Sequence, residues 1–259
     1  MKKILFALSI FMFISKFAFS QEYKNLKVCS EAGFIPFEMR TATGKWDGYD
    51  IALAKIFAKK TGRKIFFVDM KFDGLIPALI TNRGCDMIAS AVGINKEREK
   101  VVLFSQPTYQ SAYAGVIRTK DLDTYKTFES MNKSAVRIAV QSGTEASQYV
   151  KKNFTRATIL TYDDNAIPIN AVFTKKADIY IDDSVYSMIA VNRKIGHLAL
   201  IKPEVFPKND YGGMAFVFRK TDQHFCDEFN LFFSRIKENG ELKKLQTYYF
   251  EKMGWMKDM

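Results

Sequence analysis

Arg98 is the residue from which most of the chemistry in this sequence can be argued. It follows residues 90–95 (SAVGIN), an apolar run that ends in small residues and in Asn95, which can cap a helix. A planar guanidinium, exposed backbone N–H groups and the positive end of a helix all favour binding of a carboxylate. The alternative is an ordinary strand-to-helix turn, with Arg98 on a solvated face among the alternating charges of residues 96–100.

Further residues of chemical interest fall where strands are expected to end. In open α/β sheets, ligands bind outside the carboxyl ends of the strands. Glu31 and Phe34 follow the first predicted strand, and Phe72 precedes a predicted helix. Thr144 is placed to cap a helix after a turn of small residues, and Asp183 follows a strand in the second half of the chain. Each also has an ordinary interpretation, as a core aromatic or a helix cap.

Together these residues match the groups of a free α-amino acid. Its carboxylate would meet Arg98 and backbone N–H groups, and its ammonium would meet Asp183. An apolar or cationic side chain would lie between Phe34 and Phe72. The sequence shows no convincing nucleophile elbow, Cys–His pair or phosphate-binding glycine loop, although its carboxylates leave an acid–base enzyme open.

The elements that must position these residues alternate between strands and helices. Strands are predicted at 26–29, 64–68, 86–90, 112–118, 137–141, 158–162, 177–182 and 213–218. Helices are predicted at 48–62, 72–80, 144–153, 164–173 and from about 222 to 250, with Asp73 as a candidate cap. This rhythm predicts an α/β protein with mainly parallel sheets in two lobes. Residues 21–110 and 210–259 would form lobe 1, and residues 111–209 would form an inserted lobe 2.

The first twenty residues read as a secretory signal peptide. Lys2 and Lys3 precede an apolar run, and the small-x-small pattern Ala18-Phe19-Ser20 predicts cleavage after about Ser20. Removing three lysines with this segment lowers the net charge from +11 to +8. The remaining lysines are scattered, without the basic stripe and interleaved aromatics of a nucleic-acid-binding protein. We therefore expect an exported, soluble protein that does not bind nucleic acid.

The cysteines and histidines suggest neither a disulfide framework nor a metal site. Cys29, Cys85 and Cys226 are widely and irregularly spaced, so buried free thiols are the first expectation, with one disulfide as the alternative. His197 and His224 have no ligand-spaced partners. We expect no metal and no cofactor.

Several motifs, in order and spacing, resemble the periplasmic polar-amino-acid-binding proteins of ABC importers, solute-binding protein family 3. The resemblance covers nearly all of the mature chain. The matching pieces are Pro36-Phe37-Glu38, Gly48-Tyr49-Asp50-Ile51-Ala52-Leu53-Ala54, Phe72-Asp73-Gly74-Leu75-Ile76-Pro77-Ala78-Leu79, Cys85-Asp86-Met87-Ile88-Ala89-Ser90 with Arg98, Phe104-Ser105-Gln106-Pro107-Thr108-Tyr109 and Ser142-Gly143-Thr144.

The resemblance implies a type II periplasmic-binding-protein fold: two lobes joined by two crossover strands, which close on one amino acid. It assigns carboxylate binding to Arg98 and ammonium binding to Asp183. The remaining implied ligand contacts are Glu31, Phe34, Phe72, Ser90, Ala91, Gly93 and Thr144. Gly93 and Ala91 depart from the family pattern, since hydroxyl residues are common at the first position. The implied partners are a free amino acid and the membrane permease of an importer, and we expect a monomer.

Acidic residues in the implied cleft decide our expectation of the ligand. Glu31, Glu145 and Asp182 favour a cationic side chain of the arginine or lysine class, while glutamine, histidine and cystine remain open. The alternative is an exported cyclohexadienyl or prephenate-type dehydratase on the same fold. That enzyme would need a second cationic group for another carboxylate and a carboxyl of raised pKa as general acid. We therefore expect a binding protein and not an enzyme.

Overall fold

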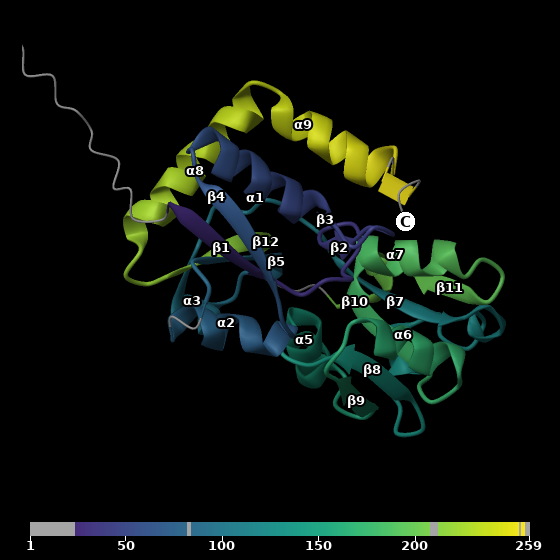
Figure 1. Ribbon diagram of the computed structural model, residues 1–259. Helices are drawn as coiled ribbons and strands as arrows, with labels where there is room; N and C mark the ends of the chain where they lie inside the picture. The colour runs from purple at the N-terminus through teal and green to yellow at the C-terminus, as the bar shows by residue number, and fades with distance from the viewer. Residues whose placement is uncertain (1–23, 82–83, 208–211, 254, 257–259) are drawn as a thin grey trace, which may run out of the picture.

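A computed structural model describes residues 24–81, 84–207, 212–253 and 255–256. It contains two five-stranded sheets, each covered by helices, side by side in an elongated molecule (Figure 1). The expected signal peptide lies outside the described residues. Among the described helices, none has the length and apolar character needed to cross a membrane.

The first sheet has the strand order β4-β1-β5-β12-β6. Its first three strands are parallel, and β12 runs antiparallel to both of its neighbours. The strand bounds are Asn25–Ser30 (β1), Lys64–Asp69 (β4), Met87–Gly93 (β5), Val102–Phe104 (β6) and Met214–Arg219 (β12). A small hairpin of β2 (Met39–Arg40) and β3 (Trp46–Asp47) lies beside this sheet.

Helices cover both faces of the first sheet. One face packs against α1 (Tyr49–Lys60), α8 (Gln223–Glu238) and α9 (Glu241–Gln246), and a π-helical turn, η3 (Thr247–Glu251), follows α9. The other face packs against α2 (Phe72–Ile80), with the short α3 (Lys96–Glu99) beyond it. The apolar stripe of α8 supplies Phe225, Phe229 and Phe232, whose rings pack on Phe57 of α1. Burial of these aromatic rings holds α1 and α8 on the sheet.

The second sheet has the strand order β11-β7-β10-β8-β9. Strands β10, β8 and β9 are parallel, whereas β7 is antiparallel to β10 and to β11. The strand bounds are Tyr113–Arg118 (β7), Arg137–Gln141 (β8), Thr158–Tyr162 (β9), Ile179–Asp183 (β10) and Leu198–Ile201 (β11). The two sheets and the comparisons given below confirm the expected type II α/β fold.

The second sheet is also covered on both faces. Helices α4 (Phe128–Met131) and α5 (Glu145–Asn153) pack on one face, and α6 (Ala166–Phe173) and α7 (Ser184–Arg193) on the other. Short 3₁₀ turns occur at η1 (Thr119–Asp121) and η2 (Pro203–Val205). Between the two sheets, Tyr109 and Met214 form an antiparallel bridge, so two passages of the chain from one sheet to the other run side by side.

Two local predictions were wrong. The turn expected at residues 90–93 is strand, because β5 continues to Gly93. Asp73 lies in the first turn of α2 and does not cap it, because the cap position is Lys71. The helical segment expected from about 222 to 250 is present as α8, α9 and η3, with a break at Gly240, which has a φ of 78°. A glycine adopts this left-handed conformation without steric cost, so the helix ends and α9 begins in a new direction.

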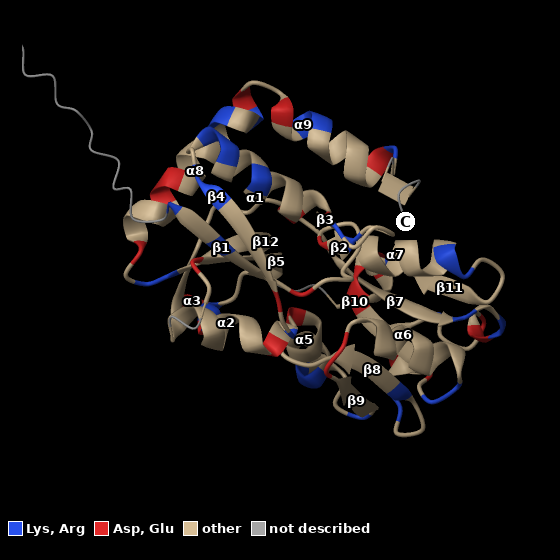
Figure 2. Cartoon of the chain, in the orientation of Figure 1, with Lys and Arg blue, Asp and Glu red and all other residues tan. Residues whose placement is uncertain are grey.

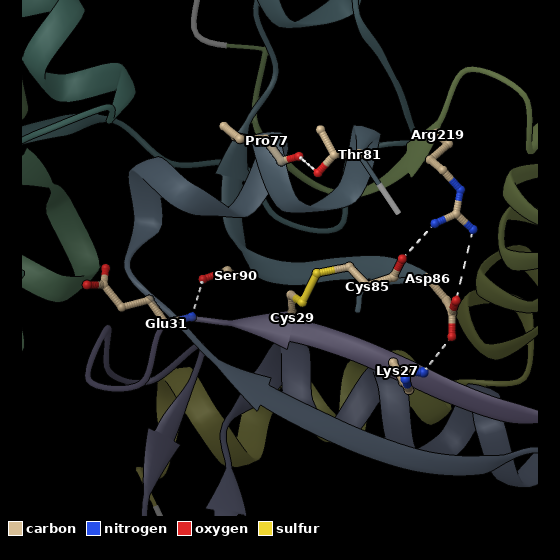
Figure 3. The surroundings of a disulfide bond; sticks show 9 residues. All are labelled: Lys27, Cys29, Glu31, Pro77, Thr81, Cys85, Asp86, Ser90 and Arg219. Atoms are coloured by element: carbon tan, nitrogen blue, oxygen red, sulfur yellow. Dashed lines mark hydrogen bonds and ion pairs between the residues drawn. A yellow bond between two sulfur atoms is a disulfide. The ribbon is translucent and has the colours of Figure 1, made fainter. Parts of the chain in front are cut away.

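The expectation of free thiols was wrong for two of the three cysteines. Cys29 and Cys85 form a disulfide, with their Cα atoms 5.6 Å apart (Figure 3). Cys29 lies on β1 opposite Ile88 of β5, and Cys85 precedes β5 by two residues. Pairing of these two strands therefore brings together two residues that are 56 positions apart. Cys226 is buried as a free thiol, as expected.

Candidate binding site

A pocket lies between the two sheets, where β1, β5, β8 and β10 end. Its walls come from both halves of the molecule. The lining residues are Glu31, Phe34, Glu38, Phe72, Ser90, Ala91, Gly93, Tyr113, Gln141, Thr144, Glu145, Ala146, Asp182, Asp183 and Met214. Acidic residues gather at the end of β10 and the start of α5, on the side of the second sheet that faces the first (Figure 2).

The structure brings all but one of the predicted site residues to this pocket. Those that line it are Glu31, Phe34, Phe72, Ser90, Ala91, Gly93, Thr144 and Asp183. The exception is Arg98, which lines an adjoining cavity with Phe72, Val92 and Gly143. What these residues bind stays a prediction at this point, because proximity alone does not identify a ligand.

The guanidinium of Arg98 is buried between the two halves of the protein. Its Nη1 donates to the carbonyl oxygen of Gly93 at 2.6 Å, and its Nη2 donates to that of Gly143 at 2.7 Å. Glu145 Oε1 is 3.7 Å from Nη1, and the guanidinium carbon is 5.6 Å from the centre of the Phe72 ring. Arg98 is thus not on the solvated face of α3, and its positive charge lies immediately behind the pocket wall.

Asn95 fixes the backbone that carries Arg98. Its side-chain oxygen accepts a hydrogen bond from the Arg98 N–H at 2.7 Å, which confirms Asn95 as the cap of α3. Its amide nitrogen donates to Glu145 at the start of α5. The Asn95 side chain, just after β5, is therefore hydrogen-bonded both to the Arg98 backbone and to α5, which packs on the second sheet.

Two helices begin at the pocket. Thr144 Oγ1 accepts from the Ser147 N–H at 3.1 Å, which confirms Thr144 as the cap of α5. Asp183 Oδ1 accepts from the N–H groups of Val185 and Tyr186 at the start of α7. The ordinary role of each residue as a helix cap is thus present, and both side chains still line the pocket. The N-terminal end of a helix attracts negative charge, so the start of α5 favours an anion beside Thr144.

Aromatic rings form the apolar part of the wall. Phe34 stacks on Tyr186 of α7, with ring centres 4.4 Å apart, and also packs against Phe37. Phe72 is the first residue of α2. It lines both the pocket and the adjoining cavity that contains Arg98. The Phe34–Tyr186 stack joins the two halves of the protein through an apolar contact.

Carboxylates dominate the polar lining. Five acidic residues line the pocket, and no Lys or Arg side chain is among its described lining residues. Glu31 Oε2 accepts from Gln141 Nε2 at 2.5 Å across the two sheets. Oxygen atoms of three of the acids are buried and accept no hydrogen bond from described residues: Glu31 Oε1, Glu38 Oε2 and Asp183 Oδ2.

Burial changes the ionisation of these acids. Removal from water disfavours a charged carboxylate and therefore raises its pKa. It raises the pKa of Glu31 to about 7, of Asp183 to about 7 and of Asp182 to about 6. Burial and the nearby charge of Asp50 raise the pKa of Glu38 well above its usual value. A positive group placed among these acids would favour their charged form.

Sequence reasoning did not assign a ligand contact to several lining residues: Glu38, Tyr113, Gln141, Ala146 and Met214. Gln141 ends β8 directly before the small-residue turn, a position that the strand-end rule could have selected. Glu38 lies in the Pro36-Phe37-Glu38 motif, but nothing local to that motif indicates which way its side chain points. Among the described residues, no cluster of three or more His, Cys, Asp or Glu is arranged to hold a metal ion.

Known amino-acid-binding proteins are similar to this chain over most of its length. The arginine-binding periplasmic protein of Mannheimia haemolytica is 29% identical over 219 residues, which cover 84% of this chain and 88% of the relative. The histidine-binding periplasmic protein of Escherichia coli is 25% identical over 263 residues, covering 97% and 98%. Cyclohexadienyl dehydratase of Pseudomonas aeruginosa is 22% identical, covering 87% and 82%.

A solved structure of a binding protein is also similar to this chain over most of its length. The binding component of an ABC transporter from Wolinella succinogenes, complexed with lysine, superposes with a TM-score of 0.82 at 28% identity, covering 90% of this chain and 99% of that one. A model of the bacterial extracellular solute-binding proteins, family 3, matches residues 26–252. The match includes both sheets and every lining residue of the pocket. The chain therefore belongs to the bacterial extracellular solute-binding proteins, family 3.

Proposed function

We propose that this protein captures a free L-amino acid with a cationic side chain, of the arginine or lysine class, and delivers it to the membrane permease of an ABC importer. Relatives named for binding arginine and histidine, and the lysine-complexed structure, support an amino-acid ligand. The pocket acids with a raised pKa meet one requirement of the dehydratase alternative. The other requirement, a second cationic group for another carboxylate, is not met among the described lining residues, which supports capture rather than catalysis.

One observation favours a cationic ligand: five carboxylates and no described Lys or Arg line the pocket. Buried acids of one sign repel each other and are stabilised by an opposite charge among them. A cationic amino acid brings two positive groups and one negative group. Its net charge of +1 complements the pocket better than that of a neutral or acidic amino acid.

In the proposed complex, the two sheets contribute different contacts. From the second sheet, Asp183 receives the α-ammonium group, and the start of α5 at Thr144 receives the α-carboxylate. Arg98 adds its charge to the carboxylate site from behind Gly93. The cationic side chain extends between Phe34 and Phe72 toward Glu31, with Ser90, Ala91 and Gly93 as the β5 wall. Residues 21–110 with 210–259 and residues 111–209 are the two lobes that close on the ligand.

A thermal-shift panel tests the proposal. The mature protein is heated alone and with each of the twenty amino acids, ornithine, cystine or prephenate. A ligand present at a hundred times its Kd adds about 2.7 kcal/mol of stability. We expect L-arginine or L-lysine to give the largest shift. A largest shift from a neutral or acidic amino acid would contradict the cationic assignment, and turnover of prephenate without any amino-acid shift would contradict the binding function.

The remaining parts of the proposal concern place and partner. We propose that the chain is exported to the periplasm, that its signal peptide is removed after about Ser20, and that it acts as a monomer. Family members named as periplasmic support the location. Mass measurement of the exported protein tests the cleavage position, and light scattering tests the monomer. Loss of amino-acid uptake on deletion, with recovery on re-expression, tests delivery.

A further inference from the structure

Strand β5 has a bulge at the pocket. In the pairing of β5 with β12, Ile88 lies opposite Val217 and Val92 lies opposite Ala215. Between these two pairs, β5 contains three residues and β12 contains one, Phe216. The additional length falls at Ser90 and Ala91, both of which line the pocket. Bulges redirect side chains and are frequent beside functional sites.

The bulge holds Ala91 in an unfavourable conformation. Its φ is 46°, in the left-handed region that residues with a Cβ atom rarely adopt. Such a conformation persists only where surrounding contacts hold it. The neighbouring Ser90 is fixed from two sides, since its Oγ accepts from the Glu31 N–H at 3.1 Å (Figure 3) and donates to Glu38 Oε1 at 3.4 Å.

Asp50 supplies the contact that holds Ala91. Its Oδ2 accepts a hydrogen bond from the Ala91 N–H at 2.8 Å, and its side chain is buried. Asp50 is in the first turn of α1, where the positive end of the helix stabilises a carboxylate. The start of α1 is itself anchored, because the Tyr49 and Asp50 N–H groups donate to the carbonyls of Pro36 and Phe37. Asp50 does not line the pocket.

We infer that Asp50 is a positioning residue for ligand binding: by holding the Ala91 N–H it fixes the left-handed bulge that shapes the β5 wall of the pocket. This inference rests on the proposed function for its ligand, but the Asp50–Ala91 coupling itself does not. Without an acceptor at position 50, the Ala91 N–H loses the hydrogen bond that offsets its left-handed conformation. The backbone at Ser90 and Ala91 then shifts toward a conformation of lower energy, and the shape of the pocket wall changes. A glycine at position 91 adopts the same φ without steric cost and so depends less on the carboxylate.

Four variants test the inference by calorimetry with L-arginine as the probe. Asp50→Ala removes the acceptor and is expected to weaken binding by roughly tenfold or more. Asp50→Asn keeps an acceptor oxygen and is expected to remain within about threefold of the wild type. Ala91→Gly alone measures the direct effect of the Ala91 methyl group, which lines the pocket, and is the reference for the double variant. Ala91→Gly in the Asp50→Ala background is expected to recover about threefold or more of the loss.

A matched control separates positioning from general stability. Leu53→Ala weakens the packing of the same helix but keeps the Asp50–Ala91 hydrogen bond, so it should lower the melting temperature and leave the Kd within about twofold of the wild type. If Asp50→Ala binds L-arginine as the wild type does, or if Ala91→Gly recovers nothing, the positioning role is overturned while the proposed function stands.

A stability cycle covers the case in which the wild type binds neither L-arginine nor L-lysine, which would overturn the proposed cationic ligand. Melting temperatures of the ligand-free wild type, both single variants and the double variant measure the coupling directly. A smaller loss from Asp50→Ala when residue 91 is glycine supports the Asp50–Ala91 link. An equal loss in both backgrounds overturns it.

Discussion

Gln141 Nε2 donates a hydrogen bond to Glu31 Oε2 at 2.5 Å, and this bond joins the end of β8 in one sheet to the loop after β1 in the other. The other oxygen of the same carboxylate, Oε1, is buried and accepts nothing from described residues. Glu31 thus holds the two halves together with one oxygen, and its other oxygen is the one that we propose to face the ligand.

Glu31→Gln tests whether Glu31 binds the cationic side chain of the ligand. The neutral amide keeps the size of the side chain but removes the negative charge, so L-arginine binding is expected to weaken by about tenfold or more. L-glutamine binding, if measurable, is expected to change by less than about threefold. Calorimetry with both ligands makes the comparison. Asp123→Asn, an exposed acid that does not line the pocket, is the control. Equal losses for the two ligands would contradict a role in side-chain recognition.

Arg98→Ala tests the carboxylate site. All amino acids carry the α-carboxylate, so binding of L-arginine and of L-lysine is expected to weaken alike, by about thirtyfold or more. The variant also removes hydrogen bonds to Gly93 and Gly143, so its ligand-free melting temperature is measured alongside. Arg156→Ala, on an exposed surface, is the control. Unchanged affinity would leave Arg98 a purely structural residue.

Affinity for L-arginine is expected to fall as the pH falls. In the empty pocket, burial raises the pKa of Glu31 and of Asp183 to about 7, so both acids take up protons below neutral pH. A bound cation favours the ionised acids, and binding at pH 5 must therefore displace protons. We expect the Kd to increase by about tenfold or more from pH 8 to pH 5. In Glu31→Gln this dependence should shrink, and a pH-independent Kd in the wild type would contradict the assignment.

Stability of the ligand-free protein should have the opposite pH trend. An acid whose pKa is higher in the folded than in the unfolded state binds its proton more tightly when folded. The contribution of Glu31 and Asp183 is complete below their ordinary values of 4.5 and 3.8 and is lost as the pH rises through about 7. Other groups titrate too, so the comparison that isolates the pocket is with and without L-arginine. The ligand's stabilisation should be larger at pH 8 than at pH 5; the reverse order would contradict the prediction.

The Cys29–Cys85 disulfide should contribute to stability. It closes a loop of 56 residues, and a bridge of this kind stabilises a protein by about 2–4 kcal/mol. Dithiothreitol should therefore lower the melting temperature of the wild type. The Cys29→Ala/Cys85→Ala variant is the control, because reductant should leave its lower melting temperature unchanged. A wild type insensitive to full reduction, checked by thiol counting, would contradict this contribution.

The sequence predicted the features that depend on local patterns. Residues 51–58 place apolar side chains on a helical face, and α1 forms there with Gly62 just beyond its end. Thr144 and Asn95 each precede a helix and cap it, because a hydroxyl or amide oxygen satisfies N–H groups that the helix leaves unpaired. The strand-end rule then selected part of the pocket lining, including Glu31, Thr144 and Asp183, without any knowledge of side-chain direction, and the family resemblance added Ser90, Ala91 and Gly93.

The features that the sequence did not predict depend on long-range pairing. The disulfide forms because β1 and β5 are neighbours in the sheet, which the spacing of Cys29 and Cys85 does not reveal. The strand character of residues 90–93 comes from pairing with β12, more than a hundred residues later. Arg98 could be linked to a carboxylate site by its neighbours, but only the approach of Gly143 shows that its guanidinium also contacts the second half of the protein.

That dual contact of Arg98 has an energetic consequence for lobe movement. Its bond to Gly93 lies within the first half of the chain, whereas its bond to Gly143 crosses to the other half. Any motion that separates the sheets must break the second bond and can leave the first intact. Arg98 would therefore remain bonded to the first sheet in such a motion and lose its bond to the second half. If the two lobes separate as proposed, water must take the place of the Gly143 carbonyl at that guanidinium, so the free energy of opening depends in part on this exchange.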